Sequence, residues 1–122
     1  MKYIFSALFV FATVVQAAEI KTTSGTINKI QFMSMDLTSY SASVGENAKS
    51  IALIHMDALP ASCGNANGFQ RVAITSDHPS YNSVVSGALA AKASGQTVEM
   101  RYFEECTLWS NSAWDFAILT VR

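Results

Sequence analysis

The sequence predicts a small β-rich domain of the α+β class, with its elements in the order β-β-β-α-β-β, behind a signal peptide that is removed on export. Five short stretches are rich in alternating or β-branched apolar residues, and polar segments rich in Gly, Asn and Ser separate them. One alanine-rich stretch with helical spacing lies between the third and the fourth of these. A further apolar run at the N-terminus belongs to targeting and not to the fold.

The N-terminal segment has the parts of a secretory signal peptide. Lys2 gives a positive start, residues 3–15 are almost entirely apolar, and Val15-Gln16-Ala17 places small or branched residues before a cleavage site. The run is shorter than the about 20 residues that a transmembrane helix needs, which makes a retained anchor the weaker alternative. We expect cleavage after Ala17, a single domain over residues 18–122, and a secreted or periplasmic protein.

The mature chain of about 105 residues is long enough for one small core. Lys2 is one of the eight basic residues, so seven remain against nine acidic ones, and they are scattered singly along the chain. A nucleic-acid-binding protein needs a clustered basic face, and an anionic membrane surface selects for the same feature. We therefore expect no nucleic-acid partner and, beyond the signal peptide, no membrane span.

The only two cysteines, Cys63 and Cys106, both lie in the exported part. In an oxidising compartment such a pair predicts a disulfide, and closing a loop of this length is worth roughly 4 kcal/mol in the chain-entropy estimate. The alternative, a metal site, lacks ligands because His55 and His78 show no ligand spacing to either cysteine. We expect no metal and no cofactor.

The predicted strands before the helix differ in character. Residues 26–33 alternate between apolar and polar but slip once near Lys29, which indicates a strand with a possible bulge. A polar segment follows, and residues 50–56 then form a short apolar run typical of a buried strand. Residues 57–70 have the composition of a loop, and residues 71–75 alternate again as the third strand.

The helix has recognisable start and stop signals. Ser76-Asp77 offers N-cap oxygens, Pro79 suits a first turn, and apolar residues recur at helical spacing over residues 81–93. Gly95 is a candidate left-handed cap at the C-terminal end. Gly87 in the interior costs roughly 1 kcal/mol relative to alanine, which indicates close packing on that face.

Two further strands are predicted at residues 97–103 and 114–121, joined by a polar loop. Three strands, one helix and two strands is the connectivity of the OB-fold, a five-stranded Greek-key barrel. The helix between the third and fourth strands would close one end of that barrel. Other α+β sheets share this order and are the alternative.

Two segments around the helix carry a resemblance to a known group. His78-Pro79-Ser80-Tyr81 before the helix, and residues 93–100 (Ala-Ser-Gly-Gln-Thr-Val-Glu-Met) after it, are similar to the B subunits of subtilase-cytotoxin and pertussis-like toxins. Gly25-Thr26-Ile27, Cys63 and Cys106 also resemble, in placement, short exported gammaproteobacterial proteins of unknown function.

The resemblance covers most of the mature chain in order and is specific around residues 76–106. Resemblance to the toxin B subunits implies an OB-fold, a ring of five copies and sugar binding at a host surface. The sugar-contacting residues of the toxin B subunits cannot be matched position by position to this sequence, so the resemblance assigns no ligand residue here.

The sequence predicts a protein that is not an enzyme. It contains no Gly-x-Ser-x-Gly elbow, no His-Glu-x-x-His motif and no phosphate-binding glycine loop. His55 lies inside an apolar run, as a core or half-buried histidine does, and His78 next to Pro79 fits the start of the helix. We therefore predict binding rather than catalysis.

The best candidate for binding a glycan is the loop between the last two strands. Trp109 and Trp114 flank Ser110-Asn111-Ser112, and indole faces stack on sugars while amides and hydroxyls bind their edges. Trp114 opens an alternating strand and is expected in the core, so Trp109 is the predicted ligand contact. A second polar loop contributes Asn65 and Asn67.

The alternative is an exported module that binds a protein through a loop or an edge strand. Met33, Met35 and Leu37 form an adaptable apolar set just after the first strand. A glycan array separates the two hypotheses. The mass of the native assembly tests whether the protein is a homo-pentamer.

Overall fold

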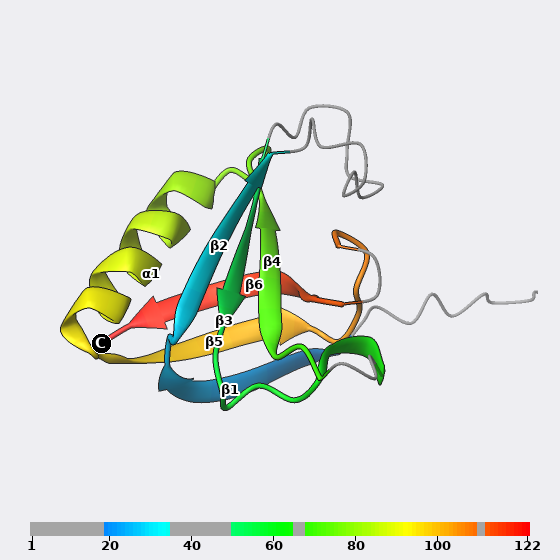
Figure 1. Cartoon of the computed structure of the whole chain (residues 1–122), viewed down its shortest axis with the longest axis horizontal. Coiled ribbons are helices and arrows are strands. Elements are labelled where there is room, and N and C mark those ends of the chain that lie inside the picture. Colours follow the sequence, from blue (N-terminus) through cyan, green and yellow to red (C-terminus); the bar gives the residue numbers. More distant parts are fainter. Residues whose placement is uncertain (1–18, 35–49, 65–67, 110–111) are drawn as a thin grey trace, which may run out of the picture.

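A computed structural model of the chain describes residues 19–34, 50–64, 68–109 and 112–122, which form six strands and one α-helix (Figure 1). The β-rich α+β class is thereby confirmed, with one strand more than predicted. The predicted signal peptide, residues 1–17, lies outside the described residues. In chain order the elements are β1 (Ile20–Thr26), β2 (Lys29–Ser34), β3 (Ser50–His55), the 3-10 turn η1 (Ser62–Gly64), β4 (Arg71–Thr75), α1 (Tyr81–Ser94), β5 (Thr97–Phe103) and β6 (Trp114–Val121).

All six strands belong to one sheet, in the order β1-β5-β6-β4-β3-β2. Neighbouring strands are antiparallel except β4 and β6, which are parallel. In Figure 1, β2, β3 and β4 run in a clearly different direction from β1, β5 and β6, so the sheet is strongly bent between its two halves. The two edge strands, β1 and β2, are consecutive in the chain and only two residues separate them.

The single strand predicted at residues 26–33 is wrong, because the chain changes partners there. β1 pairs with β5, whereas β2 pairs with β3 at the opposite edge. The break falls on Ile27 and Asn28, next to the slip in the alternation. Ile27 is 5% exposed and points into the core, while the Asn28 N–H donates to the His55 carbonyl at 3.0 Å.

The main core lies between one face of the sheet and α1. Val84, Ala88 and Ala91 supply the buried face of the helix. From the strands come alternate residues, namely Ala52, Ile54, Val72, Ile74, Val98, Met100, Tyr102, Trp114 and Phe116. The opposite face of β3 and β4 is also buried, under a smaller cluster that contains Ile51, Leu53, Ala73, Trp109 and Ala113. This double burial explains why residues 50–56 form a continuous apolar run.

A bulge in β6 overturns part of the predicted alternation of residues 114–121. Arg101 pairs with Ile118 and Tyr102 pairs with Phe116, which leaves Ala117 as the extra residue. Beyond the bulge the side chains change faces. Ile118 is therefore 46% exposed, and Leu119 packs against the core in its place.

The helix ends as predicted and begins later than predicted. Gly95 adopts φ 68° and its N–H reaches the last-turn carbonyls, while the Gln96 N–H donates to the Ala91 carbonyl at 3.0 Å. At the start the N-cap is Ser80, with no side-chain capping bond, so the predicted cap at Ser76-Asp77 is wrong. Asp77 bonds instead to the Thr75 hydroxyl at 2.5 Å, because the chain makes a turn before the helix.

The predicted disulfide is confirmed. Cys63 in η1 is bonded to Cys106 in the segment after β5; the two are 43 positions apart in sequence, with 6.3 Å between their Cα atoms. The loop before β4 is also attached to β6, because the Trp114 indole N–H donates to the Pro60 carbonyl at 3.0 Å. Within the described ranges no helix is both long and apolar enough to cross a membrane.

Candidate functional site

Three side chains able to carry positive charge stand in one row on the outer face of the sheet. The register opposes Lys29 of β2 to His55 of β3, and His55 in turn to Arg71 of β4. Register partners share a face, so the three lie on the same side as Leu53 and away from the main core. We call Lys29, His55 and Arg71 the basic row.

The basic row lines a hollow of about 400 Å³, which we call the outer hollow. Its remaining lining is Gln31 and Met33 from β2, with Phe69 and Trp109 from the adjoining loops. Neither Asp nor Glu occurs in this lining. The hollow therefore combines aromatic surface with polar and cationic groups, as ligand sites commonly do.

Arg71 is the anchored member of the basic row. The residue is 7% exposed, its Nε donates to the Ser112 carbonyl at 2.9 Å, and its Nη2 donates to the Ser112 hydroxyl at 3.0 Å. The guanidinium carbon lies 4.0 Å from the centre of the Phe69 ring, a cation–π contact. Burial lowers the pKa of Arg71, and no carboxylate of the described residues pairs with it.

His55 lies between two fixed positive charges. Burial, followed by the charges of Arg71 and Lys29, lowers the pKa of His55 to about 4, so the ring is neutral at pH 7. Its Nε2 lies 2.8 Å from Oε1 of Gln31. With the amide oxygen as acceptor, Nε2 carries the proton and Nδ1 is an acceptor.

The loop that carries Trp109 is held by one buried carboxylate. Asp115 is 5% exposed and accepts hydrogen bonds from the Thr107 N–H at 2.9 Å, the Leu108 N–H at 3.1 Å and the Thr107 hydroxyl. The Ser112 N–H donates to the Trp109 carbonyl at 3.1 Å. These bonds fix the side of the outer hollow that Trp109 forms.

The structure assigns different environments to the two tryptophans. Trp114 lies in the main core, as predicted, and is in contact with Tyr102, with 5.4 Å between the ring centres. Trp109 lines the outer hollow but is 9% exposed, since it packs in the cluster that contains Ile51 and Leu53. The other predicted ligand residues lie outside the described residues, namely Asn65, Asn67, Ser110 and Asn111.

Sequence reasoning did not find the remaining side chains of the outer hollow. Gln31, Phe69 and Arg71 carry no motif, and His55 was expected to be a core or half-buried residue. Their proximity follows from strand register, which a single sequence does not display. Met33 was singled out with Met35 and Leu37, of which the last two lie outside the described residues.

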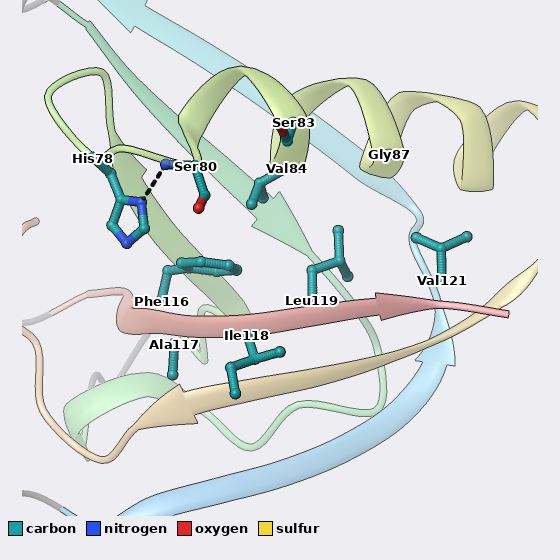
Figure 2. A pocket seen from close by; sticks show the side chains of 10 residues that line it. All are labelled: His78, Ser80, Ser83, Val84, Gly87, Phe116, Ala117, Ile118, Leu119 and Val121. Carbon is teal, nitrogen blue, oxygen red and sulfur yellow. Dashed lines mark hydrogen bonds between the residues drawn. The ribbon is translucent and has the colours of Figure 1, made fainter.

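A second depression, of about 350 Å³, lies between α1 and β6 (Figure 2). His78 borders it, with Nδ1 accepting from the Ser80 N–H at 3.0 Å and its ring edge-on to Phe116 at 5.5 Å. The His78 carbonyl also accepts from the Tyr81 N–H at 3.0 Å, so this residue takes part in the start of the helix. The depression is otherwise lined mainly by apolar groups, among them Gly87 and Ile118.

In the part of the chain that the structure describes, no three His, Cys, Asp or Glu side chains gather closely enough to hold a metal ion. Comparison of the chain with protein-family models, with curated proteins and with solved structures found no match. The resemblance to toxin B subunits therefore remains a prediction from the residues quoted above.

Proposed function

We propose that this chain is an exported, non-catalytic binding protein and that the outer hollow binds a glycan. The observation that carries the proposal is the position of Trp109 beside polar side chains on one face of the sheet. An indole edge and the Phe69 ring offer apolar surface to a sugar, while Gln31 offers an amide for its hydroxyls. A volume of about 400 Å³ suits one or two sugar rings.

The strand order supports an OB-fold-like barrel as the finer description of the fold. If β1 and β2 are the two halves of one interrupted strand, that strand pairs with both β5 and β3. The parallel contact of β4 with β6, and the helix between β4 and β5, also fit this architecture. OB-folds bind oligosaccharides on the face of their second and third strands, next to the loop before the last strand. In such a barrel β3 and β4 would be the second and third strands, and the outer hollow, lined in part by His55 and Arg71 of these strands and by Trp109, would lie near that face.

The proposal includes the resemblance to toxin B subunits and export to the periplasm or the medium. The disulfide is compatible with an oxidising compartment. A ring of five copies would multiply a weak affinity for each sugar by avidity. Sedimentation of the mature chain, residues 18–122, tests this part separately from sugar binding.

The test of the function is a glycan array followed by titration of the best ligand in solution. Tryptophan fluorescence should change on binding, because Trp109 borders the site. Trp109→Phe should remove most of that change and weaken binding, while the aromatic packing keeps the domain folded. The matched control is Leu89→Ala, a change at an exposed side chain on α1. An array without signal, or a ligand whose affinity is the same for Trp109→Phe, contradicts the proposal.

The second candidate function is binding of a protein at the edge of the sheet. β2 is an edge strand in the described sheet, and Phe32 on it is 52% exposed. An extended segment of a partner can add to such an edge by backbone hydrogen bonds. Phe32→Lys would abolish binding of this kind and leave sugar binding unchanged, because Phe32 does not line the outer hollow.

A further inference from the structure

We propose that the basic row is an oxyanion site, at which Lys29 and Arg71 bind a carboxylate, sulfate or phosphate group of the ligand. The inference rests on the proposed function and deepens it, since it gives the chemical class of the glycan as an acidic one. Its basis is the charge in the outer hollow, which nothing else in the described chain balances.

Arg71 is a buried cation without a carboxylate partner in the described chain. The residue is more than nine tenths buried, and its guanidinium donates to the neutral carbonyl and hydroxyl of Ser112. Buried charges in proteins are normally paired, because neutral acceptors do not fully repay the lost hydration. Arg71 lines the outer hollow, so its guanidinium lies at the surface that an incoming group would meet.

Lys29 adds a second uncompensated charge to the same row. Its side chain is exposed on β2, and it takes no part in an ion pair within the described residues. Among the other described basic side chains, Lys21, Arg101 and Arg122 each pair with a glutamate, whereas Lys92 on α1 is in no ion pair of the described residues but lies outside the outer hollow. Lys29 and Arg71 lie two strands apart, on either side of His55, and a bound anion would offset the repulsion between their positive charges.

His55 couples the site to pH. The charged groups that face it are Lys29 on β2 and Arg71 on β4. Asp115 of β6 lies on the same face, but its carboxylate accepts hydrogen bonds from the backbone N–H groups of Thr107 and Leu108. A bound anion opposes the two positive charges and raises the pKa of His55, so binding takes up a proton. The affinity for an anion therefore rises as the pH falls from 7.5 towards 5.

The experiment compares neutral and charged forms of one sugar at constant ionic strength. The probes are glucose, glucuronate, glucose 6-sulfate, glucose 6-phosphate and sodium sulfate, titrated into the mature chain and followed by NMR. At least one charged sugar should bind more tightly than glucose, and the three charged forms distinguish carboxylate from sulfate and phosphate. Lys29→Gln should weaken binding of that form by about five- to tenfold and should change the affinity for glucose by a much smaller factor.

Lys92→Gln is the matched control, because Lys92 is exposed on α1 and its loss changes the net charge equally. It should leave all affinities unchanged. His55→Gln should remove the pH dependence of sulfate binding. Arg71 is not used for the test because it anchors the loop through Ser112.

The outcomes separate this inference from the proposed function. Equal affinity for glucose and its charged forms, with no effect of Lys29→Gln, overturns the oxyanion site and leaves glycan binding intact. Binding of sulfate that depends on Lys29, together with no binding of any sugar here or on the array, supports the oxyanion site and contradicts the proposed function. Binding of no charged probe overturns the oxyanion site, and the glycan array then decides the proposed function separately.

Discussion

Arg71 and Ser112, 41 residues apart in sequence, are joined by two hydrogen bonds that bind β4 to the loop before β6. The pair connects the basic row to the segment that carries Trp109, because the Ser112 N–H in turn donates to the Trp109 carbonyl. The cation and the aromatic wall of the outer hollow are therefore positioned by one shared residue.

Ser112→Ala should lower the free energy of unfolding by about 1–2 kcal/mol. The substitution removes the acceptor of the Arg71 Nη2 bond at a nearly buried position and keeps the backbone carbonyl that accepts from Nε. Urea unfolding followed by circular dichroism measures the change. Ser86→Ala, at an exposed position on α1, is the control and should not destabilise the domain. Equal stability of the Ser112 variant and the parent would show that the bond contributes nothing.

Trp109→Ala should destabilise the domain by about 3–5 kcal/mol, as expected for an aromatic side chain removed from a packed cluster. The sequence alone predicts nearly unchanged stability, since it places Trp109 in a polar loop. Packing on Ile51 and Leu53 overturns that expectation. Thermal unfolding of Trp109→Ala and Trp109→Phe decides the matter: two variants as stable as the parent would mean that the indole is peripheral.

Two glycine substitutions in and after α1 should have effects of opposite sign. A Cβ at Gly87 would lie 3.6 Å from Val121 Cγ2, an ordinary contact, so Gly87→Ala should stabilise the domain by about 0.5–1 kcal/mol. The close packing expected at this position from the sequence is thus wrong. Gly95→Ala should instead cost about 1 kcal/mol, because φ 68° is unfavourable for alanine. Chemical denaturation measures both changes in stability. A Gly87→Ala variant less stable than the parent would contradict this account of the depression between α1 and β6.

His55 should make the domain less stable in mild acid. Its pKa is about 4 in the folded protein and near 6.5 in the unfolded chain, so the unfolded state binds more protons. The stabilisation is complete above pH 6.5 and is lost as the pH falls towards 4. For a half-exposed ring the loss should be about 1–2 kcal/mol. The difference in stability between the parent and His55→Gln, measured from pH 7.5 to 4, should follow this curve, and a difference independent of pH would refute it.

The elements that the sequence predicts well are those with local causes. The strands at residues 71–75, 97–103 and 114–121 have their predicted bounds. Gly95 ends the helix because the backbone at this position adopts the left-handed conformation, which glycine accommodates without strain. The predicted start of the helix is wrong because the Asp77 carboxylate accepts a hydrogen bond from the Thr75 hydroxyl in a turn before the helix. The local sequence is compatible both with a helix capped at Ser76-Asp77 and with a turn before the helix. The tertiary structure determines that the turn forms.

The features that the sequence did not predict depend on long-range pairing. The division into β1 and β2 requires two different partner strands, and the bulge at Ala117 exists only relative to β5. The basic row likewise joins Lys29, His55 and Arg71 by register alone. The sequence does indicate Trp109, because a tryptophan in a polar loop is conspicuous. It does not indicate which residues Trp109 contacts.

The most direct test is to map a bound sugar on the mature domain by NMR chemical-shift perturbation, with the best array ligand or the tightest charged glucose as the probe. The account predicts that the largest shifts occur at Lys29, His55 and the Trp109 indole. Shifts confined to the depression between α1 and β6, around His78 and Ile118, would contradict it, as would the absence of any saturable shift.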